Sequence, residues 1–525
     1  MVAQDLAGTP NVSLFNGAFT ANPSSVNLTA AAFPVTGSVN SYTISAGLGT
    51  TLTVGAAGNY TSLSGAGGLF ADINAKFLTG NTTVTILDAT VAETGAIALF
   101  PINYGCTGGP YTLTIKPASG VTTVLSGSVA GPLIDIAGAD NVTFDGSNNG
   151  TSSKDMTIRN TSTSGQSFRF LNEATANTVK NTIVEGANTS STSGVIVFST
   201  VASGTVGNSN NTINNCDIRD RSDAAGNPVN GIYNSGSSGG PNTANTISNN
   251  NIFNWTGAGV LVSGTGSGDG WSISNNNLYQ TAARTAALTA VSLAGGNNHV
   301  VSNNKLYQTT GTLSSSYTGI SITGGTNGHT ISSNSIGGAA ADRSGAALTV
   351  TSSSSNINAI SLSVGTTTAT NVNGNTVSNI AITTTSTSSS LFGVNVSGGN
   401  VNIGTIEGNT FGGGAAAYDT LRNAYDNAII NNSGSGTLDI QNNTIGNVSY
   451  YRAGGDRTAG INSSAGIVTI RNNIIRDFTV NATGTAFAFL PVGILISSAT
   501  AGNIIEGNQV FNIRNTSTGT SAYTV

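Results

Sequence analysis

The chain has 525 residues, a formal net charge of -5 and only 7% charged residues, whereas glycine fills 69 positions. A glycine content this far above the usual ~7% opposes long helices. The low charge argues against a nucleic-acid partner, because contact with the phosphate backbone needs clustered Lys and Arg. No apolar run approaches the ~20 residues that span a membrane, so membrane insertion is not expected.

The two ends of the chain carry expectations about processing. Residues 1–50 are rich in Ser, Thr and Asn, and we expect them to form a lead-in or the remnant of a preceding β domain. The chain opens with Met1-Val2-Ala3-Gln4-Asp5 and has no basic-then-apolar leader, so we expect a secretion signal that has been removed. It ends at Val525 without a polar cap, which would leave apolar edges on a repeat protein. Further domains of a longer parent chain, or end-to-end self-association, are therefore expected.

Residues 51–525 are expected to form one repetitive β domain that begins with a cap. Within 63–80 the apolar residues share the spacing of one helix face, and Gly80 follows as a stop signal. A short amphipathic helix there would plug the open end of the domain. Residues 81–180 carry less regular strand-like runs and are the expected first coils, whereas 181–525 repeat more strictly.

A pattern centred on asparagine recurs through the stricter part. It reads apolar, two polar or small residues, Asn, any residue, apolar, as in the segment from Ile247 to Ile252. The copies follow at intervals of 26 to 41 residues, about 33 on average, which is the mark of a solenoid whose units bury their apolar faces against their neighbours. Thr182 and Cys216 hold this position in the two earliest copies. The ladder positions are Asn250, Asn276, Asn304, Asn334, Asn375, Asn409, Asn443, Asn473 and Asn508.

A second landmark precedes each Asn copy. It is a small residue followed by an alternating apolar run, as in Gly319-Ile320-Ser321-Ile322, and it recurs at similar intervals. Such alternation predicts strands, and the Gly, Ser and Asn clusters between the runs predict turns, so we expect two short strands per coil. Parallel coils stack about 4.8 Å apart, so the Asn amides should hydrogen-bond along the pile. A prion-like tract, the rival interpretation, needs no fixed register of Ile, Leu and Val.

Two early stretches carry a resemblance to a known family. Residues 53–63, the helix after them and residues 133–146 resemble the opening of right-handed parallel β-helix segments in large secreted proteins of Bacteroidetes-type bacteria. The repeats resemble those of pectate lyases. From about residue 51 to the end, the resemblance implies an all-β, right-handed parallel β-helix with a short N-terminal capping helix. It also implies a bacterial secreted or cell-surface location. It does not choose among lyases, hydrolases, adhesins and stalks, which share this fold.

No linear motif marks a catalytic or metal site. A polysaccharide lyase would need a base and an acidic Ca²⁺ cage, and a polygalacturonase-type hydrolase would need paired carboxylates. The charges in the turns are instead scattered over many coils, where adjacent opposite charges are usually solvated pairs. We therefore expect no catalytic residue, no metal and no cofactor. The two histidines, His299 and His329, are expected in turns, and Cys106 and Cys216 are expected as isolated thiols. The turn charges are Arg219, Asp220, Arg221, Asp223, Asp342, Arg343, Arg452, Asp456, Arg457, Arg476 and Asp477.

The outward positions give the strongest functional lead. If the ladder Asn and the apolar residue two positions later point inward, the next residue points outward, and three successive copies place Phe253, Tyr279 and Tyr307 there. Exposed aromatic rows suit sugar rings, and polar residues beside them supply hydrogen bonds. The alternative is that the rings stack on each other or lie under a loop. Tyr450 and Tyr451 are weaker candidates. The candidate carbohydrate-binding residues are Phe253, Tyr279, Tyr307, Asn254, Gln280, Gln308 and Arg219.

These features favour a secreted or cell-surface stalk or adhesin that contacts a polysaccharide or a cell-surface glycan. A polysaccharide lyase or glycoside hydrolase of the β-helix class is the alternative. It would show three or more charged side chains converging in one cleft on adjacent coils. A structural filament subunit is the second alternative.

Overall fold

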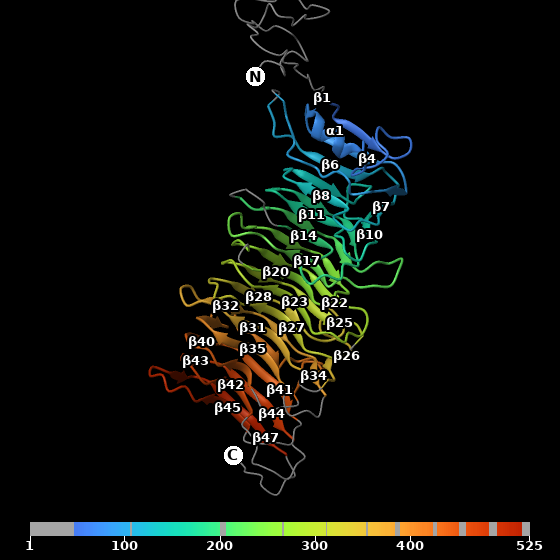
Figure 1. Ribbon diagram of the computed structural model, residues 1–525. Helices are drawn as coiled ribbons and strands as arrows, with labels where there is room; N and C mark the ends of the chain where they lie inside the picture. The colour runs from blue at the N-terminus through green and yellow to red at the C-terminus, as the bar shows by residue number, and fades with distance from the viewer. Residues whose placement is uncertain are drawn as a thin grey trace, which may run out of the picture.

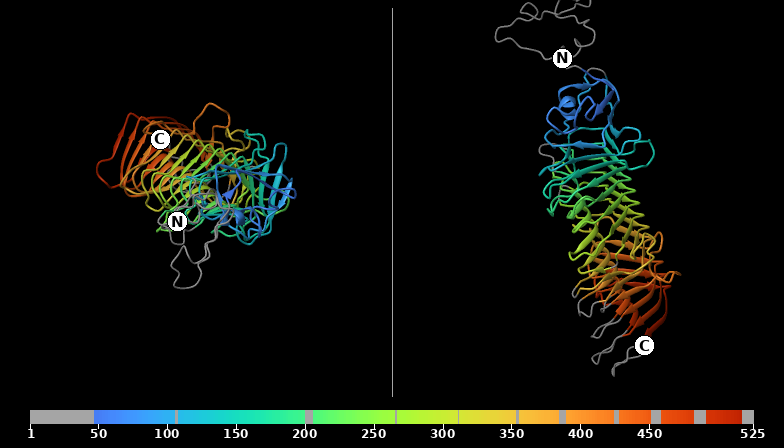
Figure 2. Two further views of the ribbon diagram at one scale, coloured as in Figure 1. Left: turned by 90° about the horizontal axis from the view of Figure 1, so that it is seen from above. Right: turned by 90° about the vertical axis from the view of Figure 1, so that its right-hand side faces the viewer.

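The computed structural model describes residues 47–516 except 106–107, 200–205, 265–266, 311, 353–354, 384–388, 424–427, 451–457 and 482–490. In this part the chain forms a parallel β-solenoid of about 13 turns with one short helix. Figures 1 and 2 show its coils stacked along an elongated body, with the N-terminal coils at one end and the C-terminal coils at the other. The expected all-β solenoid is confirmed. The lead-in predicted for residues 1–50 falls almost wholly outside the described residues.

Each regular coil contributes strands to three parallel sheets, which we call sheets 1, 2 and 3. Sheet 1 contains β2 (Thr51–Val54), β4 (Thr82–Ile86), β6 (Leu113–Pro117), β9 (Val142–Asp145), β12 (Thr178–Lys180), β15 (Thr212–Asn214), β18 (Thr246–Ser248), β21 (Ser272–Ser274), β24 (Val300–Ser302), β28 (Thr330–Ser332), β32 (Thr370–Asn373), β36 (Val401–Ile403), β40 (Thr437–Gln441), β43 (Ile467–Arg471) and β46 (Ile504–Glu506). Sheet 3 contains β8 (Ile134–Ala137), β11 (Phe168–Leu171), β14 (Ile196–Phe198), β17 (Asn230–Asn234), β20 (Ala258–Val262), β23 (Leu288–Leu293), β27 (Tyr317–Ile322), β31 (Ile357–Ser363), β35 (Leu391–Gly398), β39 (Ala428–Asn432), β42 (Thr458–Ser463) and β45 (Pro491–Ile496).

Sheet 2 contains a main ladder of strands and a shorter second ladder that joins it. The main ladder is β5 (Thr90–Ala92), β7 (Thr123–Gly127), β10 (Met156–Asn160), β13 (Thr182–Glu185), β16 (Asp217–Arg219), β19 (Asn251–Phe253), β22 (Asn277–Gln280), β25 (Lys305–Gln308), β29 (Ser335–Ile336), β33 (Thr376–Val377), β37 (Thr410–Gly412), β41 (Thr444–Tyr450), β44 (Ile474–Val480) and β47 (Gln509–Asn515). The second ladder is β26 (Thr312–Leu313), β30 (Leu348–Val350), β34 (Ile380–Ile382) and β38 (Leu421–Asn423), and β38 pairs with the second half of β41.

The expectation of two strands per coil is wrong, because each regular coil has three. The segment that looks like one strand around each ladder Asn consists of two strands joined by a corner. In the copy from Ile247 to Ile252, β18 ends at Ser248 and β19 begins at Asn251, and between them Asn249 is in the left-handed region (φ 58°). Asn is one of the few non-Gly residues that tolerate this conformation. Asn215, Asn275 and Asn303 form the same corner in neighbouring coils (φ 51°, 58° and 55°). A one-residue corner leaves no gap in the apolar pattern, so the two strands look continuous in the sequence.

The predicted Asn ladder forms inside the solenoid, just after this corner. The Oδ1 atom of each ladder Asn accepts the backbone N–H and the side-chain amide of the ladder Asn one coil earlier, at 2.8 to 3.0 Å from Asn250 to Asn508. From Asn250 to Asn473 these residues are at most 1% exposed. Cys216 starts the ladder by donating its backbone N–H to Asn250 at 2.8 Å. Its thiol is fully buried, and burial raises its pKa to about 12. Cys106 lies outside the described residues.

A second internal column at the start of sheet 1 holds the two histidines. Asn177, Asn211 and Asn245 occupy it in successive coils, with backbone N–H to Oδ1 distances of 3.0 and 2.9 Å, and the strand register continues the column through Trp271, His299 and His329. The backbone N–H of Trp271 donates to Nδ1 of His299, and that of His299 donates to Nδ1 of His329. Both histidines are fully buried. Both lie directly before β24 and β28, outside the strands, as predicted, but their side chains are buried and take the place that Asn177, Asn211 and Asn245 hold in earlier coils.

The N-terminal end is closed by the expected helix, which is shorter than the segment 63–80. It is α1 (Leu69–Ala75), and β3 (Phe77–Leu78) follows it and pairs with β1 (Gly47–Leu48). Leu69, Phe70 and Ile73 are buried in the core, so the helix covers the first coils (Figure 1). No helix of the described residues is long and apolar enough to cross a membrane.

Candidate functional site

The predicted aromatic row exists on the outer face of sheet 2. Phe253, Tyr279 and Tyr307 are in register on β19, β22 and β25. Successive ring centroids are 4.9 Å apart, and the ring planes differ by 9° and 8°. Because parallel strands place equivalent side chains about 4.8 Å apart, the rings cover one another's faces and turn their edges outward. The stacking considered as the alternative therefore occurs, while all three rings stay only partly buried.

The two ends of the row differ. At one end the guanidinium carbon of Arg219 lies 4.9 Å from the centroid of Phe253, a cation–π arrangement. At the other end the register pairs Leu306 with Ile336, so the next position after Tyr307 is Gly337, which has no side chain to continue the stack. The column therefore runs from one cation through three rings and stops at a glycine.

A polar column runs beside the rings, and the sequence reasoning missed it. Asp217, Asn251, Asn277 and Lys305 are in register two residues before the aromatic column. Asn251 donates to Asp217 at 2.7 Å, and Asn277 donates to Asn251 at 2.9 Å. Lys305 is exposed and has no ion pair or hydrogen bond to its side chain within the described part of the chain. The same two-residue alternation that predicts the rings could have predicted this column.

Burial keeps both tyrosine hydroxyls of the row in their neutral form. It raises the pKa of Tyr279 to about 12, with Tyr307 and Asp217 adding to the effect, and it also raises the pKa of Tyr307. A neutral phenol both donates and accepts hydrogen bonds. The row thus offers ring edges and neutral hydroxyls beside amide groups.

The positions expected for Asn254, Gln280 and Gln308 are wrong. These residues follow the rings in sequence, so alternation turns them inward, and they are 6%, 0% and 2% exposed. The Oδ1 atom of Asn254 accepts the backbone N–H and hydroxyl of Thr281, each at 2.9 Å. Arg284 donates to Oε1 of Gln280 at 2.7 Å. All three side chains are buried and do not flank the rings. Of the predicted polar partners, only Arg219 contacts the row.

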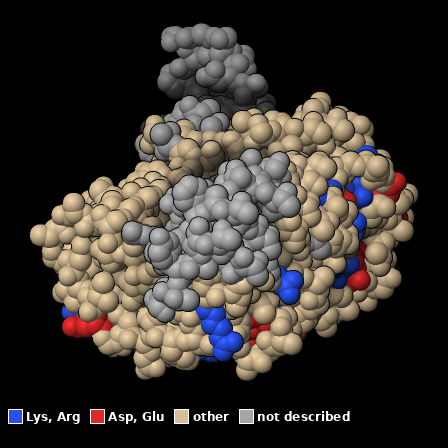
Figure 3. Space-filling model, turned by 90° about the horizontal axis from the view of Figure 1, so that it is seen from below, with Lys and Arg blue, Asp and Glu red and all other residues tan. Residues whose placement is uncertain are grey.

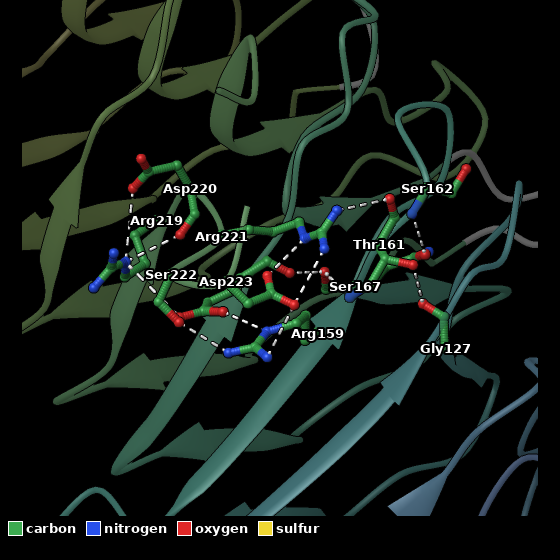
Figure 4. A network of polar contacts seen from close by, with 12 residues as sticks. Gly127, Arg159, Thr161, Ser162, Ser167, Arg219, Asp220, Arg221, Ser222 and Asp223 are labelled. Carbon is green, nitrogen blue, oxygen red and sulfur yellow. Dashed lines mark hydrogen bonds and ion pairs between the residues drawn. The ribbon is translucent and has the colours of Figure 1, made fainter. Parts of the chain in front are cut away.

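A cluster of charges lies next to the row, on β10, β13, β16 and the turn after β16 (Figure 4). Arg159 contacts Glu185 at 2.6 Å and Asp223 at 3.3 Å, and its Nη2 atom donates to the hydroxyl of Ser222 at 2.9 Å. The Glu185 side chain is only 3% exposed. The partner that completes the cluster, Arg159, comes from the irregular coils, where no repeat pattern marked it.

The cluster attaches a turn to the sheet. Arg221 forms a two-bond ion pair with Asp223 at 2.9 and 3.1 Å and donates to the carbonyl oxygen of Thr161 at 3.2 Å. Arg219 lies 3.6 Å from Asp220 and 3.9 Å from Glu185. At least three charges thus converge on adjacent coils, which is part of what an enzyme would show. Each carboxylate, however, faces an arginine, so the arrangement acts as a clamp.

Two of the other described turn charges contact the turn that follows β37, where Arg343 lies near Asp419 and Arg476 donates to the carbonyl oxygen of Gly413. Arg343 binds Ser335 and Ser378 and lies 3.9 Å from Asp419, while Asp342 caps its own turn through Ser344. Arg476 pairs with its neighbour Asp477. Figure 3 shows how sparse such charges are when the molecule is seen from its C-terminal end.

The remaining weak candidates do not join the row. Tyr450 is 2% exposed and packs against Phe478 in the core, so its assignment to the outer surface is wrong. Tyr451, Arg452, Asp456 and Arg457 lie outside the described residues. Within the described ranges no group of three or more His, Cys, Asp or Glu side chains could hold a metal ion.

Comparison with known proteins gives little beyond these observations. No family model matches the chain, and no curated protein matches it. Among solved structures, a mutant of the PL6 family alginate lyase AlyGC aligns with 82% of this chain and 98% of its own, at 11% identity and a TM-score of 0.17. A second structure of the PL6 family alginate lyase AlyGC aligns with 84% of this chain and 98% of its own, at 9% identity and a TM-score of 0.15. Similarity at this level carries no argument about a shared site.

Proposed function

We propose that the protein is a secreted or cell-surface bacterial stalk or adhesin that binds a glycan chain along the aromatic row of sheet 2. The supporting observation is the unbroken column of Arg219, Phe253, Tyr279 and Tyr307 on the outer face of consecutive coils. Core packing does not require aromatic residues at outward positions, where most neighbouring coils carry small or polar side chains.

The geometry fits an extended chain of sugar rings. The ring edges form a ridge, and the polar column beside it contains Asn277 and Lys305, whose amide and ammonium groups can bind hydroxyls. A sugar presents C–H groups to aromatic carbon and hydroxyls to amides, so it can use both columns at once. The neutral phenol groups add hydrogen bonds without repelling an acidic sugar.

A polysaccharide lyase remains the second candidate, supported by the charge cluster beside the row. β-Elimination would need a free base, and Arg159 and Arg219 are instead held by Glu185, Asp220 and Asp223. The guanidinium and carboxylate groups are occupied by one another, so this cluster offers no free base beside the row. Non-catalytic binding is therefore favoured.

The test is a glycan array and a polysaccharide pull-down with the whole chain, followed by analysis of the bound glycan for new reducing or unsaturated ends. Binding without new ends supports the proposal, whereas cleavage supports the lyase. The Tyr279→Ala/Tyr307→Ala variant should lose most of the binding. The matched control is Phe511→Ala, which removes an exposed ring from the same outward column on β47, far from the row. An equal loss in both variants, or no glycan bound by the native chain, would overturn the proposal.

A further inference from the structure

An open cleft of about 480 Å³ lies on the second ladder of sheet 2, apart from the aromatic row. Its floor follows one outward column, because the register aligns Thr349 of β30, Ala381 of β34 and Arg422 of β38. Ala381, which is 5% exposed, contributes only a methyl group between the longer side chains of Thr349 and Arg422 and lies at the bottom of the cleft. Ala347 and Tyr418 line the cleft from two turns that flank these strands.

Among the described residues that line the cleft, only Arg422 carries a charge, and its side chain is exposed. Within the described part of the chain, Arg422 makes neither an ion pair nor a side-chain hydrogen bond. All other described arginines have such a partner, for instance Asp135 for Arg169 and Gln280 for Arg284. In a chain whose net charge is -5, an unpaired guanidinium in a hollow favours an anionic ligand.

The other lining groups indicate a small polar ligand that carries this anion. Tyr418 supplies a partly exposed ring, and Thr349, Thr383 and Thr420 supply hydroxyls. Thr349 donates to the carbonyl oxygen of Ala347 at 3.0 Å, so its oxygen still can accept a hydrogen bond from a ligand. An aromatic wall, several hydroxyls and one guanidinium are the groups that recognise an acidic sugar.

We propose that this cleft binds one anionic sugar residue, with Arg422 pairing with its carboxylate or sulfate and Tyr418 packing against its ring. The site is separate from the aromatic row and does not depend on that row binding glycan. It would select charged over neutral chains, which neutral aromatic rings cannot do alone.

Calorimetric titration of the whole chain with three tetrasaccharides tests this proposal. The probes are tetragalacturonic acid, its fully methyl-esterified form and a sulfated galactose tetrasaccharide. We expect at least one anionic probe to bind about tenfold more tightly than the ester, with an affinity that falls as salt rises. The stronger of the two acidic probes identifies carboxylate or sulfate as the ligand group. Equal binding of the ester, or no binding of any probe, would overturn the proposal.

Two variants distinguish the contribution of the Arg422 charge to probe binding from that of the open space above Ala381. Arg422→Gln should reduce binding of the acidic probe about tenfold, and Ala381→Leu should reduce it similarly by filling the floor while keeping the charge. The matched control is Arg514→Gln, which removes another exposed arginine in the same outward column, on β47. Tyr279→Ala/Tyr307→Ala should leave this binding unchanged, so failure at the cleft and failure at the row are distinguishable. Unchanged binding by Arg422→Gln would contradict the assignment.

Discussion

The Oδ1 atom of Asn276 accepts two hydrogen bonds from Asn250, one from its backbone N–H at 2.9 Å and one from its side-chain amide at 3.0 Å. The same side-chain amide of Asn250 also reaches the carbonyl oxygen of Ile213, on the preceding coil, at 3.0 Å. One amide therefore connects three consecutive coils and leaves no polar atom of the side chain without a partner. This explains why a fully buried polar residue recurs at this position.

The first prediction concerns the ladder, through the isosteric change Asn334→Asp. The Asn334 amide donates to the carbonyl oxygen of Val301 at 2.8 Å and to Asn375 at 2.9 Å. Aspartate would place an oxygen opposite two oxygens in a buried site, so we expect a loss of about 3 kcal/mol in unfolding free energy. Urea unfolding measures it. The control is Asn395→Asp. The native Asn395 lies on the outer surface, where its Oδ1 atom accepts a hydrogen bond from Asn431, so this change should alter stability little. Equal effects of the two variants would contradict the internal ladder.

The ladder could be predicted from sequence because a fixed stacking position demands the same residue in every coil. The third strand could not, since Asn249 makes a corner with one residue and leaves no break in the pattern. The residue directly before each ladder Asn is itself Asn or Gly in most copies. Because these residues tolerate the left-handed conformation, this regularity was the one sequence signal for the corner.

The candidate site was predictable in part for the same reason. Phe253, Tyr279 and Tyr307 follow from alternation along the strand, and consistent use of that rule places Gln280 and Gln308 inside. The partner of Glu185, Arg159, could not be found, because it depends on a pairing between coils whose lengths vary. The cleft around Ala381 depends on turn conformations that no repeat specifies.

The second prediction is a loss of stability in acid caused by the buried histidines. Burial, together with the neighbouring His299, lowers the pKa of His329 from 6.5 to about 4, and burial also lowers that of His299. Nδ1 of each ring accepts a backbone N–H, so the ring proton is on Nε2. In His299 this Nε2 atom lies 2.7 Å from the carbonyl oxygen of Gly295.

The sign of the stability change follows from which state of the chain takes up a proton. Between pH 6.5 and pH 4 the unfolded chain binds a proton at position 329 that the folded chain does not, so the folded state loses on the order of 3 kcal/mol as the pH falls through this range. Chemical unfolding at a series of pH values measures the loss. The His299→Asn/His329→Asn variant places at both positions the residue that Asn245 contributes to the same column, and it should lose less stability in acid. An unchanged pH profile in this variant would show that other groups cause the loss.

The third prediction concerns the clamp on the turn after β16. Arg159→Gln leaves the carboxylate of Glu185, 3% exposed, without its main partner, so we expect a loss of about 3 kcal/mol. The turn should also open, and trypsin should cleave after Arg221 faster than in the native chain. The control Lys180→Gln removes the more exposed pair with Asp145 and should cost less than about 0.5 kcal/mol. Cleavage at the native rate would mean that Arg159 does not hold the turn.

The fourth prediction separates ring packing from hydroxyl bonding in the row. Tyr279→Phe/Tyr307→Phe keeps the three-ring column and removes two hydroxyls, so it should retain more glycan affinity than the double alanine variant. Affinity electrophoresis in gels that contain the bound polysaccharide compares the variants side by side. Equal retardation of the phenylalanine and alanine variants would assign the binding to the hydroxyls.

The most direct test of glycan binding by the row is the dissociation constant of one glycan for the native chain, Tyr279→Ala, Tyr307→Ala and the double variant. Because the two rings stack at 4.9 Å, removing one exposes and loosens the other. We therefore expect each single change to weaken binding about tenfold and the double change to weaken it by less than the product of the two. Four equal dissociation constants would contradict binding at the row.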